Sequence, residues 1–289
     1  MLNVFLAILF LAVVFSVLFV FLKRRKSKHQ PPLVRSEYWI YTSAENLPSD
    51  KELMERLLAR NPHRKGGVPI GAKEGLTFSD IRFHIGFAKR EQNAMMFRPE
   101  ILCETDAEIP SDIASVLEKT NAAIRVTFIS EDTPIKDTSY LQFVTHCVDA
   151  LAEITNAPLI YDVEAQKFWK REDLYNELQR NSRGDRFDLH VVIHWVETTD
   201  AGWAFTRGMA KVGLPDIEFG PVPLDHKTIA LYLVEGAARE CWKKPNLETM
   251  TVEGFGESFR IEFGEAIPNS KTHRSWVASM RAVRKIKMT

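Results

Sequence analysis

The chain begins with an uninterrupted apolar stretch, Val4 to Leu22, in which Ser16 is the single polar residue. Sixteen of its nineteen residues are Leu, Ile, Val or Phe. As a helix the stretch would be about 28 Å long, close to the roughly 30 Å of a bilayer's hydrocarbon core. A helix that is apolar on every face is a poor fit to a buried core position at the end of a chain. The stretch therefore predicts a transmembrane helix.

A cleaved signal peptide is the alternative to a transmembrane helix. It would carry basic residues before the apolar run and a small-residue cleavage site after it. Here no Lys or Arg precedes the run, whereas five cations follow it within Lys23–Lys28. Cations accumulate on the cytoplasmic side of a span, so we expect a single-pass protein of the cell (inner) membrane with a cytoplasmic C-terminal body. Three cysteines, few and odd in number, suit a reducing compartment.

Charge is unevenly distributed, although 38 basic residues balance 38 acidic ones. Five cations lie in 23–28 and six in 269–289, both without acids, so the segment 29–268 carries 11 more acids than bases. An acidic body binds nucleic acid poorly, and we expect no such partner. The basic segments Lys23–Lys28 and Arg274–Lys287 predict contact with anionic lipid, beside the contact of residues 4–22 with the bilayer. Apolar residues in the second basic segment recur at roughly helical spacing.

These features divide the chain into four segments. They are a transmembrane anchor (1–22), a basic tether (23–36), a globular domain (37–268) and a basic C-terminal tail (269–289). The globular segment is long enough for one large domain or two small ones. If there are two subdomains, we expect them to meet near residues 165–185.

Strands and helices alternate in the globular segment without a strict repeat, which predicts an α+β fold with largely antiparallel strands. The clearest unit is a strand at 124–129, a helix whose apolar residues recur from 140 to 154, and a strand at 159–161. Ser49 and Glu52 have the spacing of a capping box that starts a helix. Further helices are expected after Pro110, at 169–178 and from 225 to 244, and further strands at 38–41, 80–87, 94–98, 189–196, 202–205, 249–252 and 258–263.

The first candidate ligand site is a glycine-rich loop after residue 62. Lys65, Gly66 and Gly67 could bring a cation and accessible backbone amides to a phosphate. Gly66 and Gly71 have the spacing of a phosphate loop, but Ala72 occupies the position of its lysine. The loop also follows a helix rather than a strand, so a surface loop is the simpler interpretation.

The second candidate site consists of Asp188, His190 and His194, which share one face if residues 187–196 form a strand. Their side chains could bind a metal or transfer protons. No third ligand with metal-site spacing lies nearby, so we predict no metal site and no cofactor. A polar strand face with hydrogen-bonded histidines is the simpler interpretation.

The third candidate site is the corner between Gly202 and Glu218, where a strand leads into a short helix that Gly213 ends. Thr206 could cap this helix, which would place Arg207 and Gly208 at its N-terminus. Backbone amides there could receive an anion. A corner with a purely structural role is the alternative.

This corner also carries a resemblance. It contains the run Thr-x-Gly-Met from Thr206 to Met209 and the run Gly-Leu-Pro-Asp-Ile-Glu from Gly213 to Glu218. The pattern resembles a signature of uncharacterised bacterial domains of unknown function. The resemblance covers residues 120–265 and implies a bacterial cytoplasmic domain without known chemistry. It assigns no catalytic residues.

The sequence lacks several common catalytic signatures, among them Gly-x-Ser-x-Gly, His-Glu-x-x-His and Cys-x-x-Cys, so the catalytic residues are unknown. We expect a membrane-tethered binding module with an unknown protein partner. The alternative is an enzyme that acts on an anionic small molecule or lipid head group through Arg207 and the Gly66–Gly75 loop. Convergence of Arg207, His190 and His194 in a cleft would favour the enzyme, and separate positions would favour the binding module.

Overall fold

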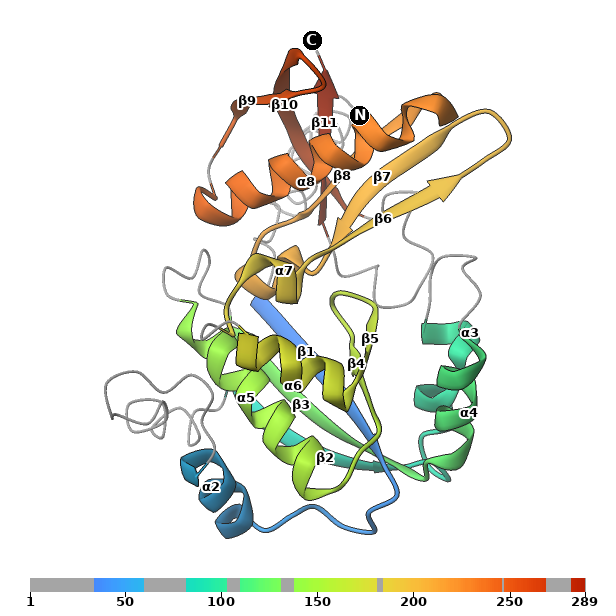
Figure 1. Ribbon diagram of the computed structural model, residues 1–289, viewed down its shortest axis with the longest axis vertical. Coiled ribbons are helices and arrows are strands. Elements are labelled where there is room, and N and C mark those ends of the chain that lie inside the picture. Colours follow the sequence, from blue (N-terminus) through green and yellow to red (C-terminus); the bar gives the residue numbers. More distant parts are fainter. Residues whose placement is uncertain are drawn as a thin grey trace, which may run out of the picture. The chain divides into compact units, whose positions relative to one another are not determined.

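Figure 1 presents the structure, a computed structural model that describes residues 34–59, 82–102, 110–130, 138–180, 184–245, 247–268 and 282–288. These residues form two β-sheets with associated helices. The prediction of an α+β fold with largely antiparallel strands is confirmed, because one strand pair is parallel and the other described pairs are antiparallel.

The first sheet has five strands in the order β2-β3-β1-β4-β5. Their bounds are β1 Val34–Thr42, β2 Phe83–Lys89, β3 Ala122–Ser130, β4 Leu159–Asp162 and β5 Lys167–Lys170. The central strand β1 is buried on both faces. Tyr38 and Ile40 belong to the large hydrophobic core, whereas Trp39 and Tyr41 belong to a smaller one. This division follows from the alternation of side chains along a strand.

Helices cover both faces of the first sheet. They are α2 Asp50–Ala59, the 3₁₀ helix η2 Ala94–Phe97, α3 Pro99–Leu102, α4 Ser111–Lys119, α5 Ser139–Ile154 and α6 Arg171–Arg180. The expected capping box starts α2: the N–H of Ser49 donates to Glu52 Oε2 (2.8 Å), and the N–H of Glu52 donates to Ser49 Oγ (3.3 Å). The expected strand at 94–98 is wrong, because Met96 N–H bonds locally to the Asn93 carbonyl and the segment forms η2.

The second sheet has six strands in the order β6-β7-β8-β11-β10-β9. Their bounds are β6 Val192–Glu197, β7 Gly202–Arg207, β8 Asp216–Val222, β9 Thr249–Gly254, β10 Glu257–Pro268 and β11 Ala282–Met288. Strand β11 lies within the segment that we expected to be a basic tail with helical spacing. It instead pairs in parallel with β8 and antiparallel with β10. Pairing on both sides supplies partners for backbone groups that would otherwise be unpaired in the middle of the sheet.

The remaining helices lie in the part of the chain that forms the second sheet. They are α7 Phe187–His190, the 3₁₀ helices η3 Met209–Val212 and η4 Leu224–His226, and α8 Lys227–Lys243. Helix α8 runs across one face of this sheet and contacts β6, β7, β8 and β9 (Figure 1). It buries Leu233, Val234 and Ala237 in the large core, which also contains Tyr38 and Ile40 of the first sheet. One hydrophobic core therefore serves both sheets, and the chain passes from the first to the second between Lys170 and Val192.

The transmembrane part of the predicted fold class requires correction. Among the helices in the described ranges, none is both long and apolar enough to span a membrane. Helix α8, with 17 residues, includes charged side chains such as Glu235 and Arg239. The apolar stretch 4–22 and the cations of 23–28 lie outside the described residues. The described residues therefore support the α+β part of the predicted fold class, and no helix among them is a candidate for a membrane span.

Candidate functional site

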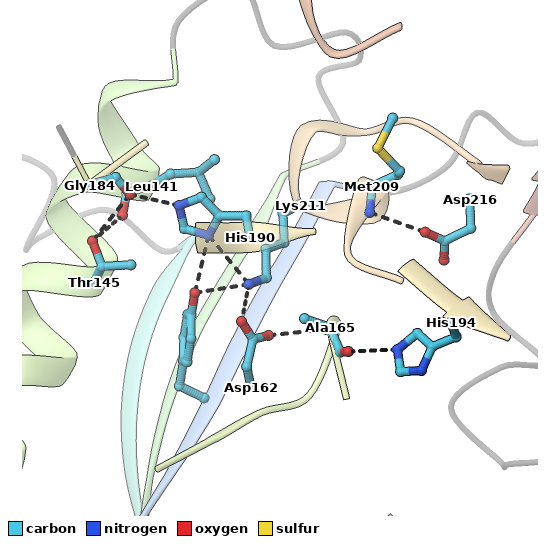
Figure 2. Close-up of polar contacts among 11 residues, drawn as sticks. Leu141, Thr145, Asp162, Ala165, Gly184, His190, His194, Met209, Lys211 and Asp216 are labelled. Carbon is cyan, nitrogen blue, oxygen red and sulfur yellow. Dashed lines mark hydrogen bonds and ion pairs between the residues drawn. The ribbon is translucent and has the colours of Figure 1, made fainter. Parts of the chain in front are cut away.

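Four polar side chains meet in the interior and connect the two sheets. Tyr38 lies on β1 and Asp162 on β4 of the first sheet, whereas His190 ends α7 and Lys211 lies on η3. Figure 2 shows the side chain of Lys211 directed between Asp162 and His190. Each of the four residues is at most 1% exposed. We call these four residues the polar joint.

Lys211 is the centre of the polar joint. Its ammonium group forms an ion pair with the Asp162 carboxylate and donates a hydrogen bond to the Tyr38 hydroxyl oxygen (2.9 Å). The same nitrogen lies 4.6 Å from the centre of the Tyr38 ring, close enough for a cation–π interaction. These contacts replace water around the ammonium group, which is necessary because an unpaired buried charge is strongly destabilising.

His190 completes the polar joint in its neutral form. Its Nε2 lies 2.6 Å from the Gly184 carbonyl oxygen, which can only accept, so Nε2 carries the proton. Nδ1 is then the acceptor that faces Tyr38 Oη (3.3 Å) and Lys211 Nζ (3.4 Å). Burial, followed by the charge of Lys211, lowers the pKa of His190 well below its ordinary value. The ring also stacks on Trp242 of α8, with centroids 6.2 Å apart.

Tyr38 and Asp162 are the two residues of the polar joint that lie in the first sheet. Burial, followed by the charge of Asp162, raises the pKa of Tyr38 well above its ordinary value. The Tyr38 hydroxyl therefore stays protonated. The second carboxylate oxygen of Asp162 accepts the N–H of Ala165 (3.1 Å), which orients the carboxylate at the β4–β5 turn.

The corner after β7 positions Lys211. The Thr206 hydroxyl donates to Asp216 Oδ1 (3.0 Å) and accepts the N–H of Ile217 (2.8 Å). Met209, the first residue of η3, donates its N–H to the same oxygen of Asp216 (3.2 Å). The N–H at the start of the short helix thus donates to the carboxylate of the chain's own Asp216.

Two glycines allow this corner to approach α7. Gly208 has φ +108°, and a Cβ at this position would lie 2.0 Å from the His190 carbonyl oxygen. Gly213, with φ +73°, follows η3. Both angles lie in the left-handed region that favours glycine. The run from Thr206 to Glu218 therefore has a structural explanation, because it brings Lys211 into contact with Asp162.

Thr206 does not cap the short helix, and Arg207 does not lie at an open helix N-terminus, as we had considered. Thr206 lies within β7, and Gly208 is the residue that precedes η3. Arg207 is fully buried, with its guanidinium carbon 4.5 Å from the centre of the Phe205 ring. One of its nitrogens donates to the Thr206 carbonyl oxygen (3.3 Å).

The strand that we expected at 189–196 begins later than predicted. The N–H of Val191 donates to the Phe187 carbonyl (2.9 Å), so residues 187–190 form α7, and β6 begins at Val192. His190 therefore joins the polar joint. His194 instead lies with Nε2 3.4 Å from the Ala165 carbonyl oxygen.

His194 and Asp188, the other two residues of the second candidate site, contact different side chains. The ring of His194 stacks on Phe205, with centroids 5.4 Å apart, and Asp188 pairs with Arg239. Among the described residues, no three His, Cys, Asp or Glu side chains cluster in a way that could hold a metal ion. His190 and Arg207 are both fully buried, so neither lines an open cleft. Lys65, Gly66 and Gly67 lie outside the described residues, and their phosphate loop stays a prediction.

Sequence reasoning missed three of the four residues of the polar joint: Tyr38, Asp162 and Lys211. The available signal was Lys211 itself, a single cation in the run Met-Ala-Lys-Val-Gly-Leu. A charged residue in an apolar run of a folded domain is seldom buried without a partner. Its partner Asp162 is 49 positions away and could not be identified by spacing.

The fold and the polar joint define an α+β protein in which two sheets share a core and a buried ion pair. No protein-family profile, curated protein or solved structure matches this chain. The resemblance of Thr206–Glu218 to uncharacterised bacterial domains therefore stays a prediction.

Proposed function

We propose that the globular part of the chain is a binding module rather than an enzyme. The observation that supports this proposal is the burial of the polar joint. A catalytic acid or base must come within hydrogen-bond reach of its substrate. Tyr38, Asp162, His190 and Lys211 instead contact one another, and at most 1% of each is exposed. The joint is thus built to hold two sheets in one arrangement, which suits a scaffold that presents a fixed surface.

We propose a protein as the partner. The segment 29–268 carries 11 more acids than bases, so its field would attract a partner with a basic surface. Large apolar side chains at the surface, such as Phe255 and Met95 (each 57% exposed), could supply the apolar contacts of an interface.

The enzyme that we considered as the alternative has less support. It would use Arg207 and the Gly66–Gly75 loop to bind an anionic substrate. The side chain of Arg207 is fully buried against Phe205, and the loop lies outside the described residues.

A comparison of two double variants tests the proposal. Asp162→Leu with Lys211→Met replaces the ion pair of the polar joint by apolar side chains, whereas Glu197→Leu with Lys227→Met replaces an exposed pair. Each full-length protein is incubated with pooled anionic metabolites and followed by NMR for new chemical species. We expect no product in any sample. A product formed by the wild type and the exposed-pair variant, but not by a folded joint variant, would show that the polar joint is catalytic.

The partner is tested separately. Crosslinking in the native cell, followed by titration of the purified candidate, should yield a complex whose affinity falls as salt concentration rises. An affinity that is independent of salt would contradict a partner selected by the acidic body.

A further inference from the structure

We propose that the polar joint is an acid-sensitive latch, which releases the contact between the two sheets when His190 takes up a proton. This inference concerns regulation of the fold and does not depend on the proposed binding function. It rests on the position of His190 Nδ1 within the joint.

A proton on His190 must be added at Nδ1, because Nε2 already donates its hydrogen to the Gly184 carbonyl. Nδ1 faces the ammonium nitrogen of Lys211 at 3.4 Å and the Tyr38 hydroxyl at 3.3 Å. A protonated ring would therefore place a second positive charge beside the first, where neither side chain is exposed to solvent. Lys211 cannot move away without leaving the carboxylate of Asp162 unpaired.

The other charged and titratable groups around the ring do not remove this conflict. On β4, Asp162 faces the joint but is already paired with Lys211. On α5, the Tyr140 hydroxyl donates a hydrogen bond to the Lys211 carbonyl, and on α8 the neighbour is the uncharged ring of Trp242.

The segment that leads into α7 contributes opposite charges. Asp185 favours a protonated His190, whereas Arg186 disfavours it. The carboxylate of Asp185 also accepts a hydrogen bond from the Thr138 hydroxyl (2.7 Å). Burial and the nearby charge of Lys211 are the larger influences, and they keep the pKa of His190 well below its ordinary value.

Acid should act on the contact between the sheets before it acts on the sheets themselves. The side chains of His190 and Lys211 lie outside the strand ladders, and η3 contacts β1 directly. An open state exposes His190 to water, where its pKa returns to about 6.5. Below that pH the open state binds one more proton than the closed state. The ratio of closed to open protein should therefore fall about tenfold per pH unit until the pKa of the closed state is reached.

Hydrogen exchange measured by mass spectrometry on the full-length protein can detect this opening. Exchange is followed from about pH 7.5 to about pH 5 and corrected for the intrinsic rate at each pH. Peptides from η3 and α7 should lose protection about tenfold per pH unit below about pH 6.5, while the β9–β10 hairpin keeps its protection. His190→Gln retains a donor and an acceptor without a titratable ring, and this variant should not show the acid-dependent loss. His226→Gln, at an exposed position in η4, is the matched control and should show the acid-dependent loss.

The inference is overturned if wild-type η3 keeps its protection to about pH 5, or if His190→Gln opens with the same pH dependence. Nitrogen-15 NMR of the His190 ring in the wild-type protein tests the latch without any substitution. Detection of a neutral ring, protonated at Nε2, until η3 opens supports the latch. Detection of a doubly protonated ring while η3 remains protected overturns it.

Discussion

The ammonium group of Lys211 and the carboxylate of Asp162 form an ion pair between the two halves of the fold, with no exposed surface on either side chain. The two residues are 49 positions apart in the sequence. Removing both charges from water costs several kcal/mol per ion, and close partners must offset this cost. Tyr38 and His190 supply part of that compensation, so the four residues should respond to substitution as one unit.

Loss of one charge from the pair should be severely destabilising. We expect Lys211→Met to lower the free energy of unfolding by about 3–5 kcal/mol, because the carboxylate of Asp162 is left buried without its cation. Urea denaturation of the full-length protein measures this change. Lys227→Met, which removes the cation of an exposed pair with Glu197, should shift the urea midpoint little.

Loss of both charges should cost less than loss of the lysine alone. In Asp162→Leu with Lys211→Met, no unpaired charge remains in the interior. A double-mutant cycle in urea should therefore show strong coupling between the two positions. Additive effects of the two single substitutions would contradict the ion pair.

Gly208 should tolerate no side chain. A Cβ at this position would lie 2.0 Å from the His190 carbonyl oxygen, in addition to the strain of φ +108°. We expect Gly208→Ala to destabilise the fold by at least about 3 kcal/mol. Gly256→Ala is the matched control, since its φ is +80° but a Cβ there meets nothing within 4 Å. It should cost about 1 kcal/mol, for backbone strain alone, and equal effects would refute the steric argument.

Thr206 should contribute through its hydroxyl rather than its shape. Thr206→Val keeps the β-branched side chain but removes the donor to Asp216 and the acceptor for the Ile217 N–H. Loss of the acceptor for the Ile217 N–H, together with loss of one of the donors to Asp216, should cost about 1–3 kcal/mol in thermal or urea unfolding. Thr251→Val, at an exposed position of β9, should change stability by less than about 0.5 kcal/mol.

Glu37 should contribute stability that acid removes. Burial alone would raise the pKa of Glu37, but hydrogen bonds from Arg35 and Trp39 and the charges of Arg35 and Arg125 outweigh burial and lower it. Because the pKa is lower in the folded state, this contribution is complete above the unfolded value of about 4.3 and disappears as pH falls below it. The difference in unfolding free energy between wild type and Glu37→Gln should therefore shrink as pH is lowered through this range. A constant difference would contradict the charged interaction.

Cys147 should be inert while the protein is folded. Burial raises the pKa of its thiol well above the ordinary value. The side chain lies on the buried face of α5 and has no exposed surface. Alkylation followed by mass spectrometry should modify Cys147 only after denaturant is added. Rapid modification of Cys147 in the native protein would show that α5 opens locally.

Most helices and strands of this fold could be predicted from local sequence patterns. Local patterns predicted the α+β class and the capping box of Ser49 and Glu52. They also predicted helices α5 and α8 and the two strands β9 and β10. Periodicity and capping act over a few residues, so they can be recognised without knowledge of the tertiary structure. The same patterns could identify the corner after Thr206, but they could not show that it brings Lys211 to Asp162.

Contacts between distant segments could not be predicted in this way, because they depend on how the helices and strands pack. Strand β11 exists because β8 and β10 offer it partners on both sides, and its own pattern did not predict a strand. His190 and His194 were expected on one face, but the helical turn of α7 separates them. Lys211 and Asp162 carry no spacing signal, since their contact depends on the packing of η3 against the first sheet. Contacts between distant segments arise from shared burial and charge neutralisation, which local sequence patterns do not encode.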